Sequence, residues 1–200
     1  MYVLKSGKPF IIGANSGKLL NSDGTEYKEP ERVRYTDIKG NAAEKQITVL
    51  AENGIHLGGT EFKPDTLITQ LDFLTLLSKT MNYYEPVITE RTDEDINRLY
   101  AYLMREGVIK EDERAPDNNV TREEAVKYLI RALKFDRVAD IKGIFNISFK
   151  DKSGISPGLE GYAVIAAGLG IVEGGNVDFR PKDKITRGES AVMIYNYLQI

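Results

Sequence analysis

The stretch "FRPKDKITRGE", residues 179–189, is one of three similar segments in this chain of 200 residues. The other two read "FKPDTLITQLD", residues 62–72, and "RAPDNNVTREE", residues 114–124. In all three, a proline is followed five residues later by a threonine, and a glycine followed by a β-branched residue stands nine to eleven positions before the proline. Such matched offsets indicate an internal repeat, so the chain is predicted to contain three units of similar structure.

The residues around each shared loop predict a helix on either side of it. Before the loop, apolar residues recur at three- and four-residue steps, as on one face of a helix. These stretches end at Gly54, Gly107 and Gly170, and glycine is favoured after the last helical turn because it adopts a left-handed conformation at little cost. After the loop, a threonine precedes an acidic residue by three positions, which is the capping box of a helix start. The pairs are Thr121 with Glu124, Thr186 with Glu189 and, as a weaker copy, Thr69 with Asp72.

These signals predict a mainly α fold with three helix-loop-helix repeats, at residues 35–83, 84–138 and 139–200. The second helices carry apolar stripes, so each repeat has faces that only another repeat can cover. The stripes are Leu71, Leu74 and Leu77; Ala125, Leu129 and Leu133; and Ala191, Ile194 and Leu198. Residues 1–34 do not fit the repeat, and their turn signals Asn-Ser-Gly and Asp-Gly predict a β-hairpin or the end of an upstream domain.

The composition is that of an ordinary globular protein, with 42% hydrophobic and 28% charged residues. A net charge of -3 offers no general attraction to nucleic acid or to an anionic membrane, so any anion binding must be local. The chain has no cysteine and one histidine, which excludes disulfides, thiolate metal sites and multi-histidine metal sites. No apolar run reaches the roughly 20 residues of a membrane span, and the N-terminus does not read as a secretory signal. We therefore expect either a cytosolic protein or a piece of a longer one.

Catalytic signatures are weak throughout the sequence. No nucleophile and base, metal cluster or glycine-rich phosphate loop stands at a convincing spacing. Gly13 and Gly17 flank a short loop, but no helix follows it as a phosphate loop requires. We therefore expect a protein that is not an enzyme and that has no cofactor.

The order of the motifs resembles the S-layer homology family over residues 35–200. That family combines an aromatic-x-Asp start, a Gly-Ile pair, a Phe-x-Pro loop and a Thr-Arg-x-Glu helix start. This sequence has the start at 35–37 and 149–151, Gly-Ile at 54–55 and 170–171, Phe-x-Pro at 62–64 and 179–181, and the helix start at 121–124 and 186–189.

The resemblance implies three repeats around a pseudo-threefold axis, with grooves between neighbouring repeats. It also implies non-covalent anchoring of an exported bacterial protein, outside the cell in the cell wall or S-layer. The implied partner is a secondary polysaccharide attached to peptidoglycan, often one that bears a pyruvyl ketal. The ligand-binding residues that the resemblance implies are Arg122, Arg187, Asp37, Asp151, Gly58 and Gly174.

Two readings of the arginines remain open at this stage. A helix N-terminus has unpaired amides and a partial positive charge, so an arginine beside it can form a site for a carboxylate. A closed threefold ring would place Arg187 beside Asp37 and Arg122 beside Asp151. Alternatively, the two arginines pair with nearby carboxylates or lie in solvent.

Several departures from the family pattern keep a second function open. The first repeat has Gln70 in place of the arginine, and the second has Glu111 where the others have glycine. The chain has no tryptophan, which leaves Tyr35 or Tyr162 to stack on a sugar. The alternative is therefore a degenerate S-layer homology domain that acts as a structural or protein-interaction module. Residues 14–24 are also similar to the last hairpin of PepSY-like or YcdB/YcdC-type domains.

Overall fold

A computed structural model of the protein describes residues 11–12, 16–20, 33–81 and 91–200. The chain divides into two compact units, Met1–Arg32 and Val33–Ile200, which are considered separately below. In the first unit, strand β1 (Ile11–Ile12) pairs antiparallel with strand β2 (Leu19–Leu20), with Ile11 opposite Leu20. The Asp-Gly turn signal at 23–24 lies outside the described residues.

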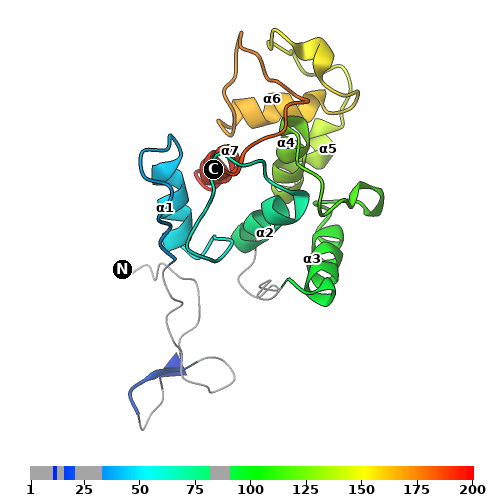
Figure 1. The fold of residues 1–200 in the computed structure, drawn as a ribbon. Helices are drawn as coiled ribbons and strands as arrows, with labels where there is room; N and C mark the ends of the chain where they lie inside the picture. Colours follow the sequence, from blue (N-terminus) through cyan, green and yellow to red (C-terminus); the bar gives the residue numbers. More distant parts are fainter. Residues whose placement is uncertain (1–10, 13–15, 21–32, 82–90) are drawn as a thin grey trace. The chain divides into compact units, whose positions relative to one another are not determined.

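The second unit is built from helices, which confirms the predicted mainly α class (Figure 1). Six helices form three consecutive pairs, and each pair encloses one of the proline-bearing loops. The pairs are α1 (Glu44–Glu52) with α2 (Gln70–Met81), α3 (Asp93–Arg105) with α4 (Arg122–Ala132), and α6 (Glu160–Gly168) with α7 (Arg187–Tyr197). A short helix α5 (Asp136–Ala139) and two 3-10 turns, Glu111–Glu113 and Lys152–Gly154, lie in the connections.

The second helices of the three pairs, α2, α4 and α7, contact one another. Each first helix packs on the second helix of the preceding pair: α3 on α2, α6 on α4, and α1 on α7 (Figure 1). The last of these contacts joins the start of the unit to its end. The helices therefore form a closed ring, in which each apolar face is covered by a helix from another pair.

The three loops close the same ring through their backbones. The N–H of Ile68 donates to the carbonyl of Ile185, that of Ile185 to Val120, and that of Val120 to Ile68, at 3.0, 3.0 and 3.1 Å. All three side chains are buried. Each loop thus donates once and accepts once, which is a threefold hydrogen-bonding pattern at the centre of the ring.

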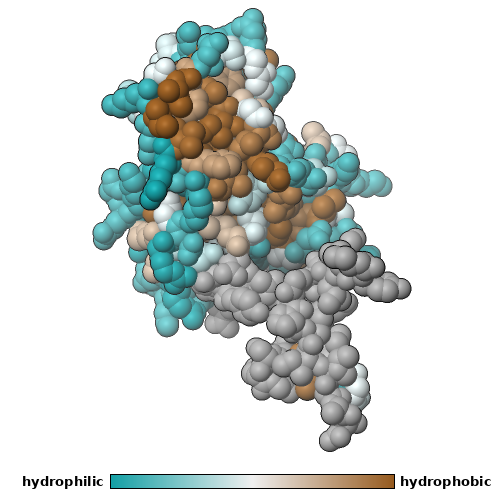
Figure 2. All heavy atoms as spheres, turned by 180° about the vertical axis from the view of Figure 1, so that it is seen from behind, coloured by the Kyte–Doolittle hydropathy of each residue, from teal (hydrophilic) through white to brown (hydrophobic). Residues whose placement is uncertain are grey.

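The apolar stripes lie where the sequence places them, with one exception. Leu74, Leu77, Leu129 and Ile194 are completely buried. Leu198 was expected to continue the stripe of α7 but is 42% exposed; it is the C-cap residue, one position beyond the end of the helix at Tyr197. Figure 2 shows a further apolar patch over the segment that follows α4, where the exposed residues are Phe135, Val138, Ile141 and Ile144.

Candidate functional site

Each second helix begins against the loop of the next pair, and this arrangement creates three equivalent junctions. We name them after the first residue of the helix: the Gln70, Arg122 and Arg187 junctions. In each, the N–H of that residue donates to a loop carbonyl of the following pair. The acceptors are Asn118 at 2.8 Å for Gln70, Asp183 at 2.9 Å for Arg122, and Thr66 at 2.8 Å for Arg187.

The backbone N–H groups of the first helical turn are already hydrogen-bonded in these contacts. At the Arg122 junction, the N–H of Glu123 also donates to the carbonyl of Pro181, and at the Arg187 junction the N–H of Gly188 donates to that of Pro64. The expectation that unpaired helix amides would help to hold an anion is therefore wrong. Any attraction for an anion at these junctions comes from the guanidinium groups themselves.

The predicted capping boxes are present at α4 and α7. The Thr186 hydroxyl accepts from the N–H of Glu189 at 3.1 Å, and the Glu189 carboxylate accepts from the N–H of Thr186 at 2.9 Å. Thr121 and Glu124 make the same reciprocal pair. At α2 only half of the box is formed: the Thr69 hydroxyl accepts from the N–H of Asp72 at 3.2 Å.

Arg187 lies against the start of the first helix pair. Its Nη1 is 3.0 Å from Oδ2 of Asp72, and its guanidinium carbon lies 5.3 Å from the centre of the Phe62 ring. Burial lowers the pKa of Arg187, and the charges of Tyr35 and Asp37 oppose that shift. The structure thus brings Arg187 and Asp37 into electrostatic contact. The Nε of Arg187 is buried and has no hydrogen-bond partner among the described residues.

Asp37 and Asp151, the last residues of the two aromatic-x-Asp starts, hold the Phe-x-Pro turns at 62–64 and 179–181. The Asp37 carboxylate accepts from the N–H groups of Phe62 and Lys63 at 2.8 and 2.6 Å, and the residue that it holds, Lys63, has a φ of 57°. Although partial burial raises the pKa of Asp37, these bonds and the charge of Arg187 bring it below its ordinary value. Asp151 bonds Phe179 and Arg180 in the same way. Both aspartates therefore fix a left-handed residue in the loop.

Arg122 is in looser contact with carboxylates than Arg187. Its nearest ion-pair partner is Glu189, whose Oε1 is 3.7 Å from Nη1, and its Nε is buried without a partner among the described residues. Burial lowers the pKa of Arg122 and the charge of Arg180 lowers it further, whereas Glu189 acts in the opposite direction. Asp151 was predicted to face Arg122. Its carboxylate interacts with the charge of Arg180 instead.

The Gln70 junction has a neutral side chain in place of the arginine, and its amide group is fully hydrogen-bonded. Gln70 is 4% exposed, and its amide group makes four bonds, which is all that two donors and two oxygen lone pairs allow. Its Nε2 donates to the Glu113 carbonyl and the Tyr128 hydroxyl, and its Oε1 accepts from the Tyr100 hydroxyl and the Ala115 N–H, at 2.7 to 3.0 Å. This junction is part of the core.

The remaining predicted residues have structural surroundings. Gly58 has a φ of 79°, a conformation that residues with a side chain rarely adopt. A Cβ on Gly174 would approach the Cβ of Ala167 to 3.1 Å. Glu111, at the corresponding position of the second pair, opens a 3-10 turn instead.

Neither tyrosine presents a free ring to a sugar. Tyr162 is 2% exposed, its hydroxyl donates to Asp140 at 3.0 Å, and its ring lies 5.9 Å from the Arg131 guanidinium carbon. The expectation that Tyr162 replaces the family tryptophan is therefore wrong. Tyr35 packs on Phe62 with ring centres 5.1 Å apart, and its hydroxyl accepts from the N–H of Leu57. Tyr35 remains partly exposed beside Arg187.

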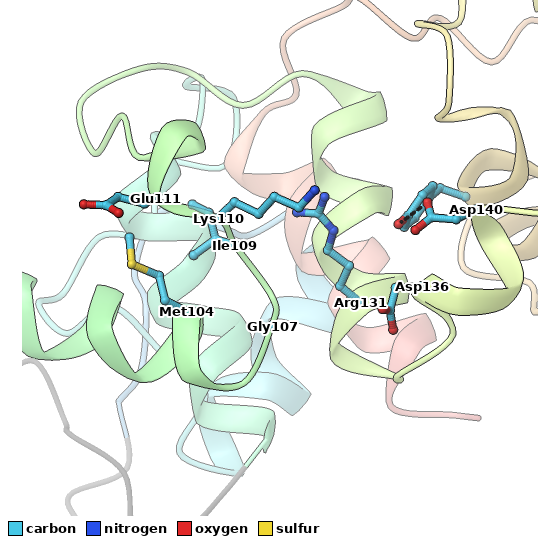
Figure 3. Close-up of a pocket in the computed structure, with 9 residues that line it drawn as sticks. Met104, Gly107, Ile109, Lys110, Glu111, Arg131, Asp136 and Asp140 are labelled. Carbon is cyan, nitrogen blue, oxygen red and sulfur yellow. Dashed lines mark hydrogen bonds between the residues drawn. The ribbon is translucent and has the colours of Figure 1, made fainter.

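A hollow of about 540 Å³ lies away from these junctions, between the end of α3 and helices α4 to α6 (Figure 3). Its wall includes Lys110, Glu111, Arg131, Asp136, Asp140 and Tyr162. Sequence reasoning gave no indication of this hollow, because its residues come from four separate helices and two connections. Among the described residues, no group of three or more histidine, aspartate or glutamate side chains could hold a metal ion.

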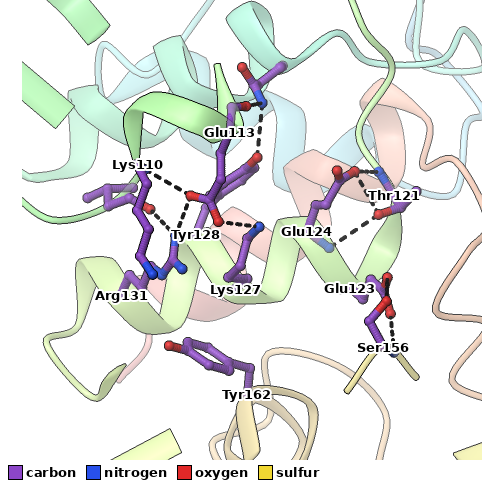
Figure 4. A network of polar contacts seen from close by, with 12 residues as sticks. Lys110, Glu113, Thr121, Glu123, Glu124, Lys127, Tyr128, Arg131, Ser156 and Tyr162 are labelled. Atoms are coloured by element: carbon purple, nitrogen blue, oxygen red, sulfur yellow. Dashed lines mark hydrogen bonds and ion pairs between the residues drawn. The ribbon is translucent and has the colours of Figure 1, made fainter. Parts of the chain in front are cut away.

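The wall of the hollow is supported by an ion cluster that no sequence motif marks (Figure 4). Glu113 accepts from Lys127 at 2.8 Å and from Arg131 at 2.6 Å, and it also accepts from the N–H of Lys110. Although burial raises the pKa of Glu113, these bonds lower it to about 2. The cluster ties the 3-10 turn to α4.

Comparison with known proteins agrees with the resemblance seen in the motifs. The model of the S-layer homology domain matches residues 148–191, which span the last loop and the start of α7. Residues 148–191 therefore belong to the S-layer homology family. The boundaries of the three predicted repeats remain predictions.

Two curated relatives match almost the whole chain. Exoglucanase XynX of Acetivibrio thermocellus is 32% identical over 204 residues, which cover 96% of this chain and 18% of the relative. Amylopullulanase of Thermoanaerobacterium thermosulfurigenes is 30% identical over 202 residues, which cover 94% of this chain and 11% of the relative. The chain thus spans less than a fifth of either relative.

The family match places an S-layer homology domain at residues 148–191, and domains of this family associate with the cell surface and bind cell-wall polymers in general. Within the described residues, no helix is long and apolar enough to cross a membrane.

Proposed function

We propose that this chain anchors an exported bacterial protein to the cell wall by binding a secondary polysaccharide that carries a carboxylate, such as a pyruvyl ketal. The binding sites are the Arg122 and Arg187 junctions. The observation that carries the proposal is the state of the two arginine side chains: they are 16% and 17% exposed, and each has a buried Nε without an acceptor among the described residues.

A carboxylate ligand would supply the missing acceptors. Buried N–H groups are nearly always hydrogen-bonded, because an unmade bond leaves the cost of desolvation uncompensated. Guanidinium and carboxylate groups match in a two-pronged geometry that also selects the ligand by shape. A protein with a negative net charge could thus still recognise the single negative charge of a ketal on a neutral sugar.

The other predicted ligand residues support the arginines in this proposal. Asp37 and Asp151 hold the loops beside which the ligand would lie, and Gly58 and Gly174 keep side chains out of the neighbouring turns. No catalysis is proposed for the chain. The relatives' names describe glycan-degrading enzymes, so we propose that a further domain of the same polypeptide does the work that anchoring localises.

A sedimentation assay with cell-wall sacculi tests the function. The chain should sediment with sacculi that retain their secondary polymer and should remain in solution once acid has removed that polymer. Equal retention by both preparations would contradict polysaccharide binding.

Substitution of the arginines tests the sites. The double variant Arg122→Ala/Arg187→Ala should lose polymer binding, and its melting curve must show that it is folded, because Arg187 pairs with the buried Asp72. Lysine at the same positions should restore part of the binding, since it keeps the charge without the two-pronged contact. Arg98→Ala is the matched control, since Arg98 is 59% exposed and pairs with Asp95 within α3. Unchanged binding in the folded double variant would favour the structural or protein-interaction module.

A further inference from the structure

The acidic residue three positions after the capping threonine is used differently in the three second helices. In α4 and α7 it is a glutamate, and its carboxylate closes the capping box on the threonine N–H. In α2 it is Asp72, one methylene shorter. The two oxygens of Asp72 bind arginines instead: Oδ2 accepts from Arg187 at 3.0 Å, and Oδ1 accepts from Arg91.

We propose that Asp72 is a built-in competitor of the ligand, which fills the Arg187 junction with the protein's own carboxylate and leaves the Arg122 junction as the tighter anion site. This inference rests on the proposed function for the identity of the ligand. Asp72 thus determines which of two sites with similar sequence motifs binds the ligand more tightly.

The geometry at Arg187 supports the competition. Asp72 is 6% exposed, so its carboxylate lies inside the junction rather than over it. It occupies Nη1 of Arg187 at hydrogen-bonding distance, and its negative charge compensates that of the guanidinium. A ligand carboxylate must then bind beside the like charge of Asp72, or displace Asp72 and leave that charge buried.

The Arg122 junction lacks this occupant. Glu189 stands at the equivalent place, but it accepts from the Thr186 N–H at 2.9 Å and from Arg180 at 3.2 Å. It therefore stays 3.7 Å from Arg122, beyond hydrogen-bonding distance. Arg180 brings a second, half-exposed guanidinium to the same junction. A ligand carboxylate can thus bind Arg122 without displacing a hydrogen-bonded carboxylate of the protein.

The first test compares the single arginine variants in calorimetric titrations with a pyruvylated wall-polymer fragment. Arg122→Ala should weaken the tight binding by about tenfold or more, the effect expected for losing about 1.4 kcal/mol of a charge-assisted contact. Arg187→Ala should weaken it less, because that junction already holds Asp72. An equal or larger loss in Arg187→Ala would overturn the inference, and this comparison does not require any change at Asp72.

The second test removes the competitor. Asp72→Asn keeps the size of the side chain, so it should unmask the Arg187 junction and add a second binding event that Asp72→Asn/Arg187→Ala lacks. Glu61→Gln is the matched control, because it removes one negative charge from an exposed residue, which pairs with the exposed Lys63. One binding event of unchanged affinity in folded Asp72→Asn would contradict competition.

Pyruvate alone separates the inference from the proposed function. At millimolar concentration it should raise the melting temperature of Asp72→Asn more than that of the parent, through Arg187, since a ligand stabilises the state that it binds. If pyruvate does so while no variant binds the polymer, the anchoring proposal fails and the role of Asp72 stands. Equal stabilisation of the parent and Asp72→Asn would overturn that role.

Discussion

The Gln70 and Arg122 junctions share the same backbone hydrogen bonds, but their central side chains differ in charge and in whether their hydrogen bonds are satisfied. In both, the first two N–H groups of a second helix donate to carbonyls of the next loop, at 2.8 and 3.0 Å for Gln70 and Leu71, and at 2.9 and 3.1 Å for Arg122 and Glu123. At Gln70 a neutral amide satisfies all its bonds inside the core, whereas at Arg122 a guanidinium is left with an unpaired Nε. The ring is therefore held by its backbone, and one side-chain position decides whether a junction is packed or able to bind.

The largest effect is expected from breaking the packed junction. Gln70→Ala removes four hydrogen bonds and leaves two tyrosine hydroxyls and two backbone groups without partners, several of them buried. The free energy of unfolding should fall by about 3 kcal/mol, because each buried group left unsatisfied costs about 1 to 3 kcal/mol. Urea denaturation measures the loss, and Gln199→Ala, at an exposed position, is the control. A loss below about 1 kcal/mol would show that this junction is no more packed than the others.

A smaller effect is expected at the ion cluster beside the Gln70 junction. Glu113→Gln should cost about 2 kcal/mol at neutral pH, less than a fully buried pair, because Lys127 and Arg131 lose their shared carboxylate. The pKa of Glu113 is lowered from 4.5 to about 2, so its contribution is complete above pH 4.5 and is lost as the pH falls toward 2. The difference between variant and parent should vanish over that range. Glu52→Gln, on an exposed residue, is the charge-matched control; a difference between Glu113→Gln and the parent that persists at pH 2 would contradict the ion-pair assignment.

The smallest effects should distinguish the helix starts. Thr186→Ala should lower the free energy of unfolding by about 1 kcal/mol, because it removes an N-cap that belongs to a complete capping box. Thr69→Ala should lower the free energy of unfolding about half as much, near 0.5 kcal/mol, since Asp72 does not complete the capping box and its carboxylate binds arginines instead. Thermal and urea unfolding measure both, and equal losses would show that the two helix starts do not differ as described.

The local features of the fold could be predicted from the sequence. The three glycines at the ends of the first helices have φ values of 82°, 68° and 74°, and the capping boxes stand where the threonine and glutamate spacing placed them. These features depend on residues a few positions apart, so a short sequence window contains the information that decides them. The family resemblance also rested on such windows, and the match at residues 148–191 agrees with it.

The candidate sites could be predicted only in part. Arg187 was expected beside Asp37 and interacts with its charge, but the carboxylate that it hydrogen-bonds is that of Asp72, 115 residues away in the sequence and marked by no motif. The saturated amide of Gln70 and the cluster around Glu113 were missed for the same reason. The expected role of helix amides failed because the neighbouring loops had already used them.

The sequence by itself determined the helices, their ends, the loop between them and the type of residue that opens each second helix. Only the tertiary structure decided what each of those residues does. The same backbone position holds a glutamine in α2, an arginine beside a glutamate in α4 and an arginine beside a shorter aspartate in α7. The partners of these three side chains differ. The physical reason is that hydrogen bonds and ion pairs act over about 3 to 4 Å in space, and the closure of the ring brings together residues that the sequence keeps far apart.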